Sequence, residues 1–239
     1  MPLTLKQHAY QVILDKLLGG NLVPGGRLSD DVLAREMGIS RSPVREAISQ
    51  LSTEGLVEYR PRSGAYVKAI DRTELEELYD LREALEGHAA GKAAQLISPA
   101  ALAELTEVVA GMRTIAFECR SLSTHVAGNE LTEKFLANDL KFHMAILQAA
   151  GNQRLLNLVR DLRIMTRVFG FVPVDHDLKV ITSTYRYHAT ILRAFERRDS
   201  AAAQSWMVGH IRVARTVVLA GYDRREWDRD SSAPPKEEG

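Results

Sequence analysis

The fold is decided by the stretch from residue 22 to 67, which reads LVPGGRLSDDVLAREMGISRSPVREAISQLSTEGLVEYRPRSGAYV. Its first part begins with a turn rich in proline and glycine. Ser29 and Asp30 then offer good N-caps, because their side-chain oxygens can accept the first unpaired backbone N–H groups of a helix. Gly38 follows Met37 and breaks the pattern. This part therefore predicts one short helix.

The second part of the stretch predicts another helix and a β-hairpin. Ser40 caps a helix over residues 41–53, and two short extended arms follow around residues 61–64, a turn of Pro, Arg, Ser and Gly. Gly64 allows close approach to another backbone. Working outward, apolar residues at helical spacing predict a first helix over residues 5–18. The order of helix, helix, tight turn, helix and hairpin predicts a winged helix-turn-helix.

The start of the helix over residues 41–53 carries the side chains that favour DNA binding. In a helix-turn-helix, the second helix lies in the major groove, and its N-terminal residues reach base edges. Arg41 and Arg45 are four apart on one face, and the fork of an arginine can bond O6 and N7 of guanine together. Ser40 and Ser42 can bond phosphate oxygens. A winged helix used only for protein contacts is the alternative.

The bulk composition is that of an ordinary globular protein. A length of 239 residues suits two domains better than one. Lys and Arg number 31, as do Asp and Glu, so the zero net charge gives DNA binding no support and the case depends on local pattern. Cys119 is the only cysteine, which excludes an intramolecular disulfide and a cysteine-based zinc finger. With no signal peptide and no apolar run of about 18 residues, we expect a cytoplasmic protein without membrane contact.

The rest of the chain predicts helices alone. Asp71 and Glu74 form a capping-box pattern, and a long helix runs from there to about residue 96. Ser98 caps the next helix. Further helices are predicted over residues 130–149, 152–168, 180–197 and 200–221.

The predicted fold class is therefore mainly α. A winged helix-turn-helix domain over residues 1–70 is followed by an all-helical antiparallel bundle of about six or seven helices over residues 71–223. The tail over residues 224–239 is polar and contains prolines, so we expect it to be disordered at its end.

Four side chains in the helical half form a candidate metal site. Asp139 and His143 are four apart on one predicted helix, which puts both on one face. His188 and His210 lie in two other predicted helices, beside apolar residues at helical spacing. Three imidazoles and one carboxylate suit a divalent metal such as zinc, nickel or manganese. Spacing alone equally allows buried histidines that only make hydrogen bonds.

The N-terminal stretch resembles the DNA-binding domain of the GntR family of bacterial transcriptional regulators, through SRSPVREA followed by a GLV. The resemblance implies DNA contacts by Ser40, Arg41, Ser42 and Arg45, with Gly64 in the wing. Arg62 flanks the wing turn and is a further candidate from its position alone. Asp31 departs from the pattern, because family members often carry a basic residue there that also touches DNA. A carboxylate cannot make that phosphate contact, so the role is not carried over.

The C-terminal half is similar to the FCD ligand-binding domain of the FadR-type branch of that family. The similar segments are LYDLREALEG, DLKFHMAILQAAGN and YHATILRAFERRDSAAAQSWMVGHI. In metal-containing members, an Asp and three His converge, and they correspond to Asp139, His143, His188 and His210. The resemblance thus implies a divalent metal, with zinc expected first and nickel or manganese as alternatives. Arg82 corresponds to an arginine that commonly faces the effector cavity; the alternative is a solvated salt bridge with Glu86.

These resemblances imply a regulator and not an enzyme. We expect a homodimer that reads a near-palindromic operator in double-stranded DNA, controlled by a small carboxylic or sugar acid bound beside the metal. Repression relieved by the effector is the commoner arrangement. Two alternatives stay open: a metalloenzyme that uses the Asp/His site, and a regulator with a purely structural metal. The sequence leaves the effector, the operator, the metal and the sign of regulation open.

Overall fold

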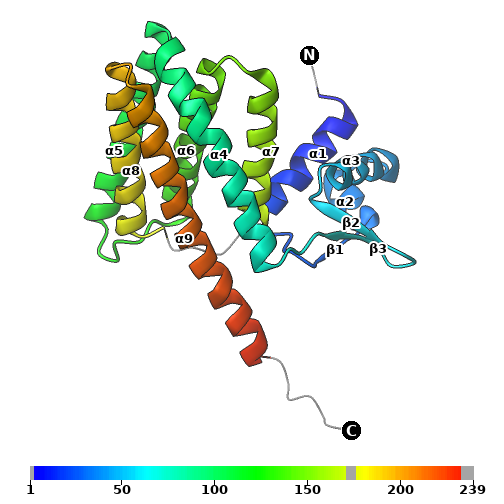
Figure 1. Cartoon of the computed structure of the whole chain (residues 1–239). Coiled ribbons are helices and arrows are strands. Elements are labelled where there is room, and N and C mark those ends of the chain that lie inside the picture. Colours follow the sequence, from blue (N-terminus) through cyan, green and yellow to red (C-terminus); the bar gives the residue numbers. More distant parts are fainter. Residues whose placement is uncertain (1–2, 171–175, 233–239) are drawn as a thin grey trace. The chain divides into compact units, whose positions relative to one another are not determined.

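The computed structural model describes residues 3–170 and 176–232. The described chain contains nine helices and three short strands, which confirms a mainly α fold with a winged helix-turn-helix at its N-terminal end (Figure 1). It forms two compact units. One contains the described parts of residues 1–78, 163–172 and 221–239, and the other contains those of residues 79–162 and 173–220.

Three helices form the winged-helix core. They are α1 (Leu5–Leu18), α2 (Asp30–Met37) and α3 (Arg41–Thr53), and both α1 and α2 pack against α3. The Ser29 side chain accepts the Val32 N–H and begins α2, while Gly38 ends it with φ of 65°, a left-handed conformation that glycine adopts without strain. The predicted ranges of these helices are confirmed, and so is Ser29 as the cap of α2, whereas Ser40 stands at the N-cap of α3 without a side-chain hydrogen bond.

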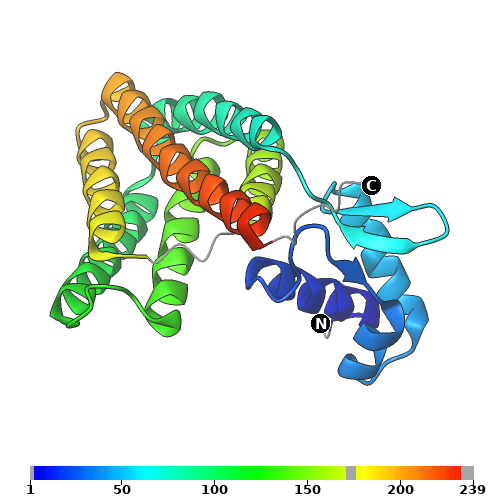
Figure 2. The same cartoon turned by 90° about the horizontal axis from the view of Figure 1, so that it is seen from below.

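A three-stranded antiparallel sheet completes this domain. Its strands are β1 (Arg27–Leu28), β2 (Val57–Arg60) and β3 (Gly64–Val67), in the order β1-β3-β2. The β2–β3 hairpin is the predicted wing, and Figure 2 shows it, in cyan, extending beyond the three helices of its domain. The sequence did not predict β1, because two residues are too few to show the alternation of a strand.

Six helices make up the rest of the described chain, within the predicted number. They are α4 (Arg72–Leu96), α5 (Pro99–Ser121), α6 (Asn129–Ala149), α7 (Gln153–Phe169), α8 (Leu178–Glu196) and α9 (Ser200–Ser232). The helix α5 packs against α6 and α8. None of the helices in the described ranges has the length and apolarity that crossing a lipid bilayer requires.

The last helix is longer than predicted. It was expected to end near residue 221, but α9 continues to Ser232, so residues 224–232 of the predicted tail are helical. Residues 233–239, where we expected disorder, lie outside the described residues. Helices α4, α7 and α9 each contribute residues to both compact units, so the domain boundaries at residues 70 and 223 stay a prediction.

Two glycines bring α9 close to α4. A Cβ on Gly87 would lie 2.7 Å from Cγ2 of Val208, and one on Gly91 would lie 3.2 Å from the carbonyl oxygen of Ser200. A larger residue at Gly87 would require Val208 to shift, and one at Gly91 would crowd the start of α9. This close approach matters for the site below, because α9 carries His210.

Candidate functional site

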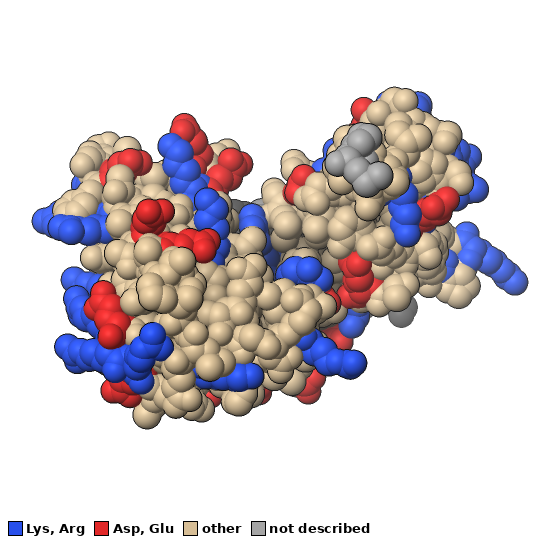
Figure 3. All heavy atoms as spheres, turned by 90° about the horizontal axis from the view of Figure 1, so that it is seen from above, with Lys and Arg blue, Asp and Glu red and all other residues tan. Residues whose placement is uncertain are grey.

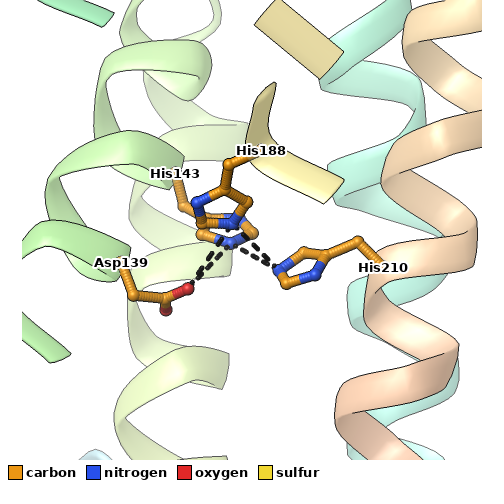
Figure 4. Close-up of side chains that lie close together, drawn as sticks. All are labelled: Asp139, His143, His188 and His210. Atoms are coloured by element: carbon orange, nitrogen blue, oxygen red, sulfur yellow. Dashed lines mark hydrogen bonds and ion pairs between the residues drawn. The ribbon is translucent and has the colours of Figure 1, made fainter. Parts of the chain in front are cut away.

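Three helices bring the predicted metal ligands together. Helix α6 supplies Asp139 and His143, α8 supplies His188 and α9 supplies His210. Figure 4 shows the four side chains pointing toward one another. One ligand atom from each lies within 4.8 Å of all the others. Residues up to 71 positions apart in the sequence therefore form one cluster.

The distances inside the cluster fit a shared metal ion. Nε2 of His210 lies 3.3 Å from Nε2 of His143 and 3.1 Å from Nε2 of His188. Two nitrogens that bind one zinc ion at about 2.0–2.1 Å lie about 3.0–3.4 Å apart at ordinary coordination angles. Without an ion, three converging nitrogens satisfy one another poorly, because each N–H···N bond needs a donor and an acceptor.

The carboxylate completes the donor set from the open side. Oδ1 of Asp139 lies 3.7 Å from Nε2 of His143 and 3.6 Å from Nε2 of His188, too far for hydrogen bonds but suitable for two ligands of one ion. The Asp139 side chain is 21% exposed, whereas those of His143 and His188 are almost completely buried. Asp139 is therefore the member of the cluster that meets solvent most.

Apolar groups surround the histidines on the buried side. The ring of Phe142 stacks on that of His188, with centroids 3.9 Å apart and planes 10° from parallel. Sδ of Met112 lies 2.9 Å from Nδ1 of His188. These contacts enclose His188 within the bundle.

Glu86 supports the cluster from α4. Its Oε2 lies 2.5 Å from Nδ1 of His143, and its Oε1 accepts a hydrogen bond of 2.7 Å from Nε of Arg82. Histidine ligands of metals typically donate their second ring N–H to such a carboxylate, which fixes the tautomer. From the sequence, Glu86 was expected only as a salt-bridge partner of Arg82. Its place on the apolar face of α4, in line with Leu75 and Tyr79, was the available signal.

Arg82 pairs with Glu86, as the predicted alternative has it, but the pair is buried and not solvated. Only 6% of Arg82 and 1% of Glu86 is exposed. Burial lowers the pKa of the Arg82 guanidinium, but the negative charge of Glu86, together with smaller effects of Tyr79 and Asp139, outweighs this and raises it above the ordinary value. Arg82 therefore stays charged within electrostatic reach of the cluster.

The DNA-reading end of α3 is exposed, as its predicted role requires. Arg41 and Arg45 face solvent, while Val44, Ile48 and Leu51 are buried on the opposite side. Ser40 is the N-cap through its backbone, with no side-chain cap bond. Its hydroxyl and that of the exposed Ser42 stand at the positive end of the helix, where phosphate oxygens bind well.

Carboxylates of α2 pair with both arginines. Oδ2 of Asp30 lies 2.5 Å from Nε of Arg45 and 3.1 Å from Nη2 of Arg41, and Oδ1 of Asp31 lies 2.9 Å from Nε of Arg41. Partial burial raises the pKa of Asp30, but the hydrogen bonds and charges of Arg45 and Arg41 outweigh it and lower the pKa below its ordinary value. Figure 3 shows acidic and basic side chains mixed over the face in view, in keeping with the zero net charge.

The wing places a different set of side chains at its turn. Gly64 has φ of 103°, a conformation that requires glycine, and Arg62 in the exposed turn has φ of 61°. Arg60 stacks over the ring of Tyr66 at 4.2 Å and pairs with Glu58 at 2.8 Å. Arg60 is thus held against the sheet, whereas Arg62 stands at the tip.

A winged helix-turn-helix with exposed arginines, joined to a helical domain that encloses an Asp/His cluster, defines a DNA-binding transcriptional regulator. Comparison with protein families specifies which kind. The model described as "Bacterial regulatory proteins, gntR family" matches residues 5–67, and that of the "FCD domain" matches residues 77–213. The chain belongs to the GntR family of bacterial transcriptional regulators, in the group that carries an FCD domain.

Individual relatives agree with this assignment. HTH-type transcriptional repressor RspR of Escherichia coli (strain K12) is 25% identical over 224 residues, covering 93% of each chain. HTH-type transcriptional regulator LutR of Bacillus subtilis (strain 168) is 29% identical over 223 residues, covering 85% of this chain and 95% of LutR. Among solved structures, E. coli McbR/YncC shares the fold, with a TM-score of 0.76 and 19% identity over 92% of this chain and 100% of that one. The chain is a regulator and not an enzyme, so the metalloenzyme alternative falls.

Proposed function

We propose that this chain is a repressor whose affinity for its operator is controlled by a small carboxylic or sugar acid, bound beside a divalent metal ion in the FCD domain. One observation carries the proposal: ligand atoms of one carboxylate and three imidazoles converge within 4.8 Å. FCD domains are known to bind metal ions. The relative RspR is named a transcriptional repressor, which supports repression here. The regulator works in the cytoplasm, where its DNA lies.

The ligands of the metal are Asp139, His143, His188 and His210. Zinc is our first choice, with nickel or manganese as alternatives, because three imidazoles and one carboxylate suit all three ions. When bound, the ion supplies a Lewis-acidic position for an oxygen of the effector. Arg82 supports an acidic effector, because a guanidinium pairs strongly with a carboxylate and this one lies within electrostatic reach of Asp139.

At the other end of the chain, α3 and the wing contact the operator. The contacting residues of this proposal are Ser40, Arg41, Ser42, Arg45, Arg62 and Gly64. Two copies of the chain form a homodimer that reads a near-palindromic site. Effector binding favours one placement of the two winged helices, and by linkage DNA changes the affinity for effector by the same factor.

A thermal-shift screen tests the sensor role. The full chain is stripped of metal by a chelator, and one half of the sample is restored with zinc. Both halves are then screened against carboxylic and sugar acids. We expect at least one acid to raise the Tm of the zinc-restored half and to leave the Tm of the stripped half unchanged. The matched variants are His188→Ala, which loses the response, and His88→Ala, which keeps it because His88 is exposed on α4 and outside the cluster.

A structural metal without an effector is the remaining alternative, and DNA release separates it from the sensor. The acid that raises the Tm is added to the chain bound to a DNA duplex that it selected from a random-sequence pool. The sensor hypothesis predicts release that depends on zinc. If stripping and restoring zinc leave both acid binding and DNA release unchanged, the metal is structural and the sensor hypothesis is wrong.

A further inference from the structure

We infer that Asp30 and Asp31 make the winged helix selective, by competing with DNA phosphates for Arg41 and Arg45. The inference rests on DNA binding by this domain and concerns what the carboxylates of α2 add to it. These two residues stand in the first turn of α2, and the arginines stand in the first two turns of α3. The helix-turn-helix therefore presents four charged side chains as one group at its exposed end.

The contacts within this group are ion pairs with short distances. Asp30 holds both arginines, with Oδ2 at 2.5 Å from Nε of Arg45 and at 3.1 Å from Nη2 of Arg41. Asp31 adds a second carboxylate to Arg41, at 2.9 Å from its Nε. The two arginines thus meet two carboxylates, so the local charge of this group is balanced. The expected positive end of the DNA-reading helix is neutralised before DNA arrives.

Neutralisation weakens contacts to phosphate more than contacts to bases. Non-specific binding comes almost entirely from basic side chains that replace the counterions of DNA phosphates. An arginine that is already paired gains little by exchanging a carboxylate for a phosphate. In addition, Asp31 is 53% exposed on its side chain, so its charge repels the DNA backbone. Non-specific complexes, which depend on phosphate contacts, are therefore weakened the most.

When Arg45 contacts a base, its ion pair with Asp30 can persist. The pair between Arg45 and Asp30 uses Nε, and the fork of an arginine reaches O6 and N7 of guanine with its other N–H groups. A carboxylate that fixes Nε also limits the rotamers of the arginine, so less entropy is lost when the fork meets a base. Asp30 is the less exposed of the two acids, with a side chain 23% exposed, and acts as a positioning residue for Arg45.

A simpler role for both acids is that of negative charges at a helix N-terminus, where they offset the partial positive charge of the helix. That role predicts lower thermal stability on neutralisation and no special effect on DNA. Glu36 offers the matched control, because it lies on the same helix, carries the same charge and pairs with Lys16 of α1 at 2.8 Å.

The test measures binding of the full chain to two labelled duplexes over a range of salt. One duplex has mixed sequence, and the other is the duplex that the wild-type chain selected from a random-sequence pool. We expect Asp31→Asn to tighten binding to the mixed duplex about fivefold to tenfold near 0.1 M salt and to steepen the salt slope by about one phosphate contact. Binding to the selected duplex improves less, so the ratio of the two affinities falls. Glu36→Gln leaves that ratio unchanged.

Two further variants keep the inference open to refutation. Asp31→Ser must reproduce the effect of Asp31→Asn if the lost charge is responsible. In the Arg41→Gln background, Asp31→Asn must lose the part of its effect that comes from freeing Arg41 and keep only the part that comes from repulsion of the DNA backbone. Equal tightening on both duplexes, or an effect no larger than that of Glu36→Gln, would overturn the inference while leaving DNA binding intact. A wild-type chain that binds neither duplex would instead overturn the DNA-binding function, and the inference with it.

Discussion

Two arginine–carboxylate groups, one in each functional region, use the same chemistry in opposite environments. In the FCD domain, Nε of Arg82 lies 2.7 Å from Oε1 of Glu86, and their side chains are only 7% and 2% exposed. In the winged helix, Nε of Arg45 lies 2.5 Å from Oδ2 of Asp30, and these side chains are 62% and 23% exposed. The distances are similar, so burial is what distinguishes the two pairs.

Burial decides whether such a pair can be exchanged. Removing one partner of a buried pair leaves an uncompensated charge away from water, which costs about 3–5 kcal/mol. Removing one partner of an exposed pair costs about 0–1 kcal/mol, because water solvates the remaining charge. The pair in the FCD domain is therefore a fixed part of the structure. The pair in the winged helix adds little to stability, and Arg45 can still reach a base with its other N–H groups.

The largest effect is expected for Glu86→Gln. It leaves Arg82 without its negative partner, so the free energy of unfolding of the metal-free chain should fall by about 3–5 kcal/mol. Denaturant unfolding in the presence of a chelator measures this. The control is Glu83→Gln on the same helix, because Glu83 pairs with Arg212 at the surface, where the Arg212 side chain is 66% exposed. Equal midpoints for the two variants would contradict a fixed buried pair.

The second effect concerns the metal cluster itself. His188→Ala removes one of three imidazoles, so we expect the metal content of the purified chain to fall and its stabilisation by zinc to disappear. For a chain that binds one ion, that stabilisation is about 2.7 kcal/mol when free zinc is 100 times Kd. Elemental analysis and thermal unfolding with and without zinc measure both. His88→Ala should behave as wild type, and full occupancy in His188→Ala would disprove the ligand assignment.

The third effect is on DNA. Arg45→Ala removes a predicted contact to a base, and we expect it to weaken binding to the selected duplex by about 1–3 kcal/mol at fixed salt. Fluorescence anisotropy measures the change. Arg154→Ala removes the same charge from an exposed position of α7 and serves as the control for net charge. An affinity equal to that of the control would refute the assignment of α3 as the recognition helix.

The two regions also differ in how far the sequence predicts them. The winged helix could be predicted almost completely, because its helices, caps and hairpin are set by neighbours in the chain. Even there, β1 was missed and the pairing of Asp30 with Arg45 was not foreseen, since both depend on contacts between separate elements.

The Asp/His cluster was a candidate from residue type and spacing, and only the resemblance to the family favoured a shared metal over separate buried histidines. Helical spacing links Asp139 to His143, but nothing local links them to His188 or His210, which lie on other helices. The packing of α4 against α9 at Gly87 brings Glu86 and His210 to the same place, and sequence patterns contain no information on that contact. The supporting carboxylate of Glu86 was therefore missed, while the four predicted ligands do lie together.

The smallest effect is expected for Asp30→Asn, which removes the exposed pair with Arg45. The pKa of Asp30 is lowered below its ordinary value of 3.8, so its ion pairs stabilise the folded chain above that pH. This contribution is lost as the pH falls through the lowered pKa, because a protonated Asp30 pairs with neither arginine. Asp30→Asn should thus cost less than about 1 kcal/mol at neutral pH and nothing once Asp30 is protonated. Urea unfolding of wild type and variant from pH 7 to well below pH 3.8 measures the difference. A loss of several kcal/mol, or one that persists in acid, would mean that this exposed pair is as important for stability as the buried one between Arg82 and Glu86.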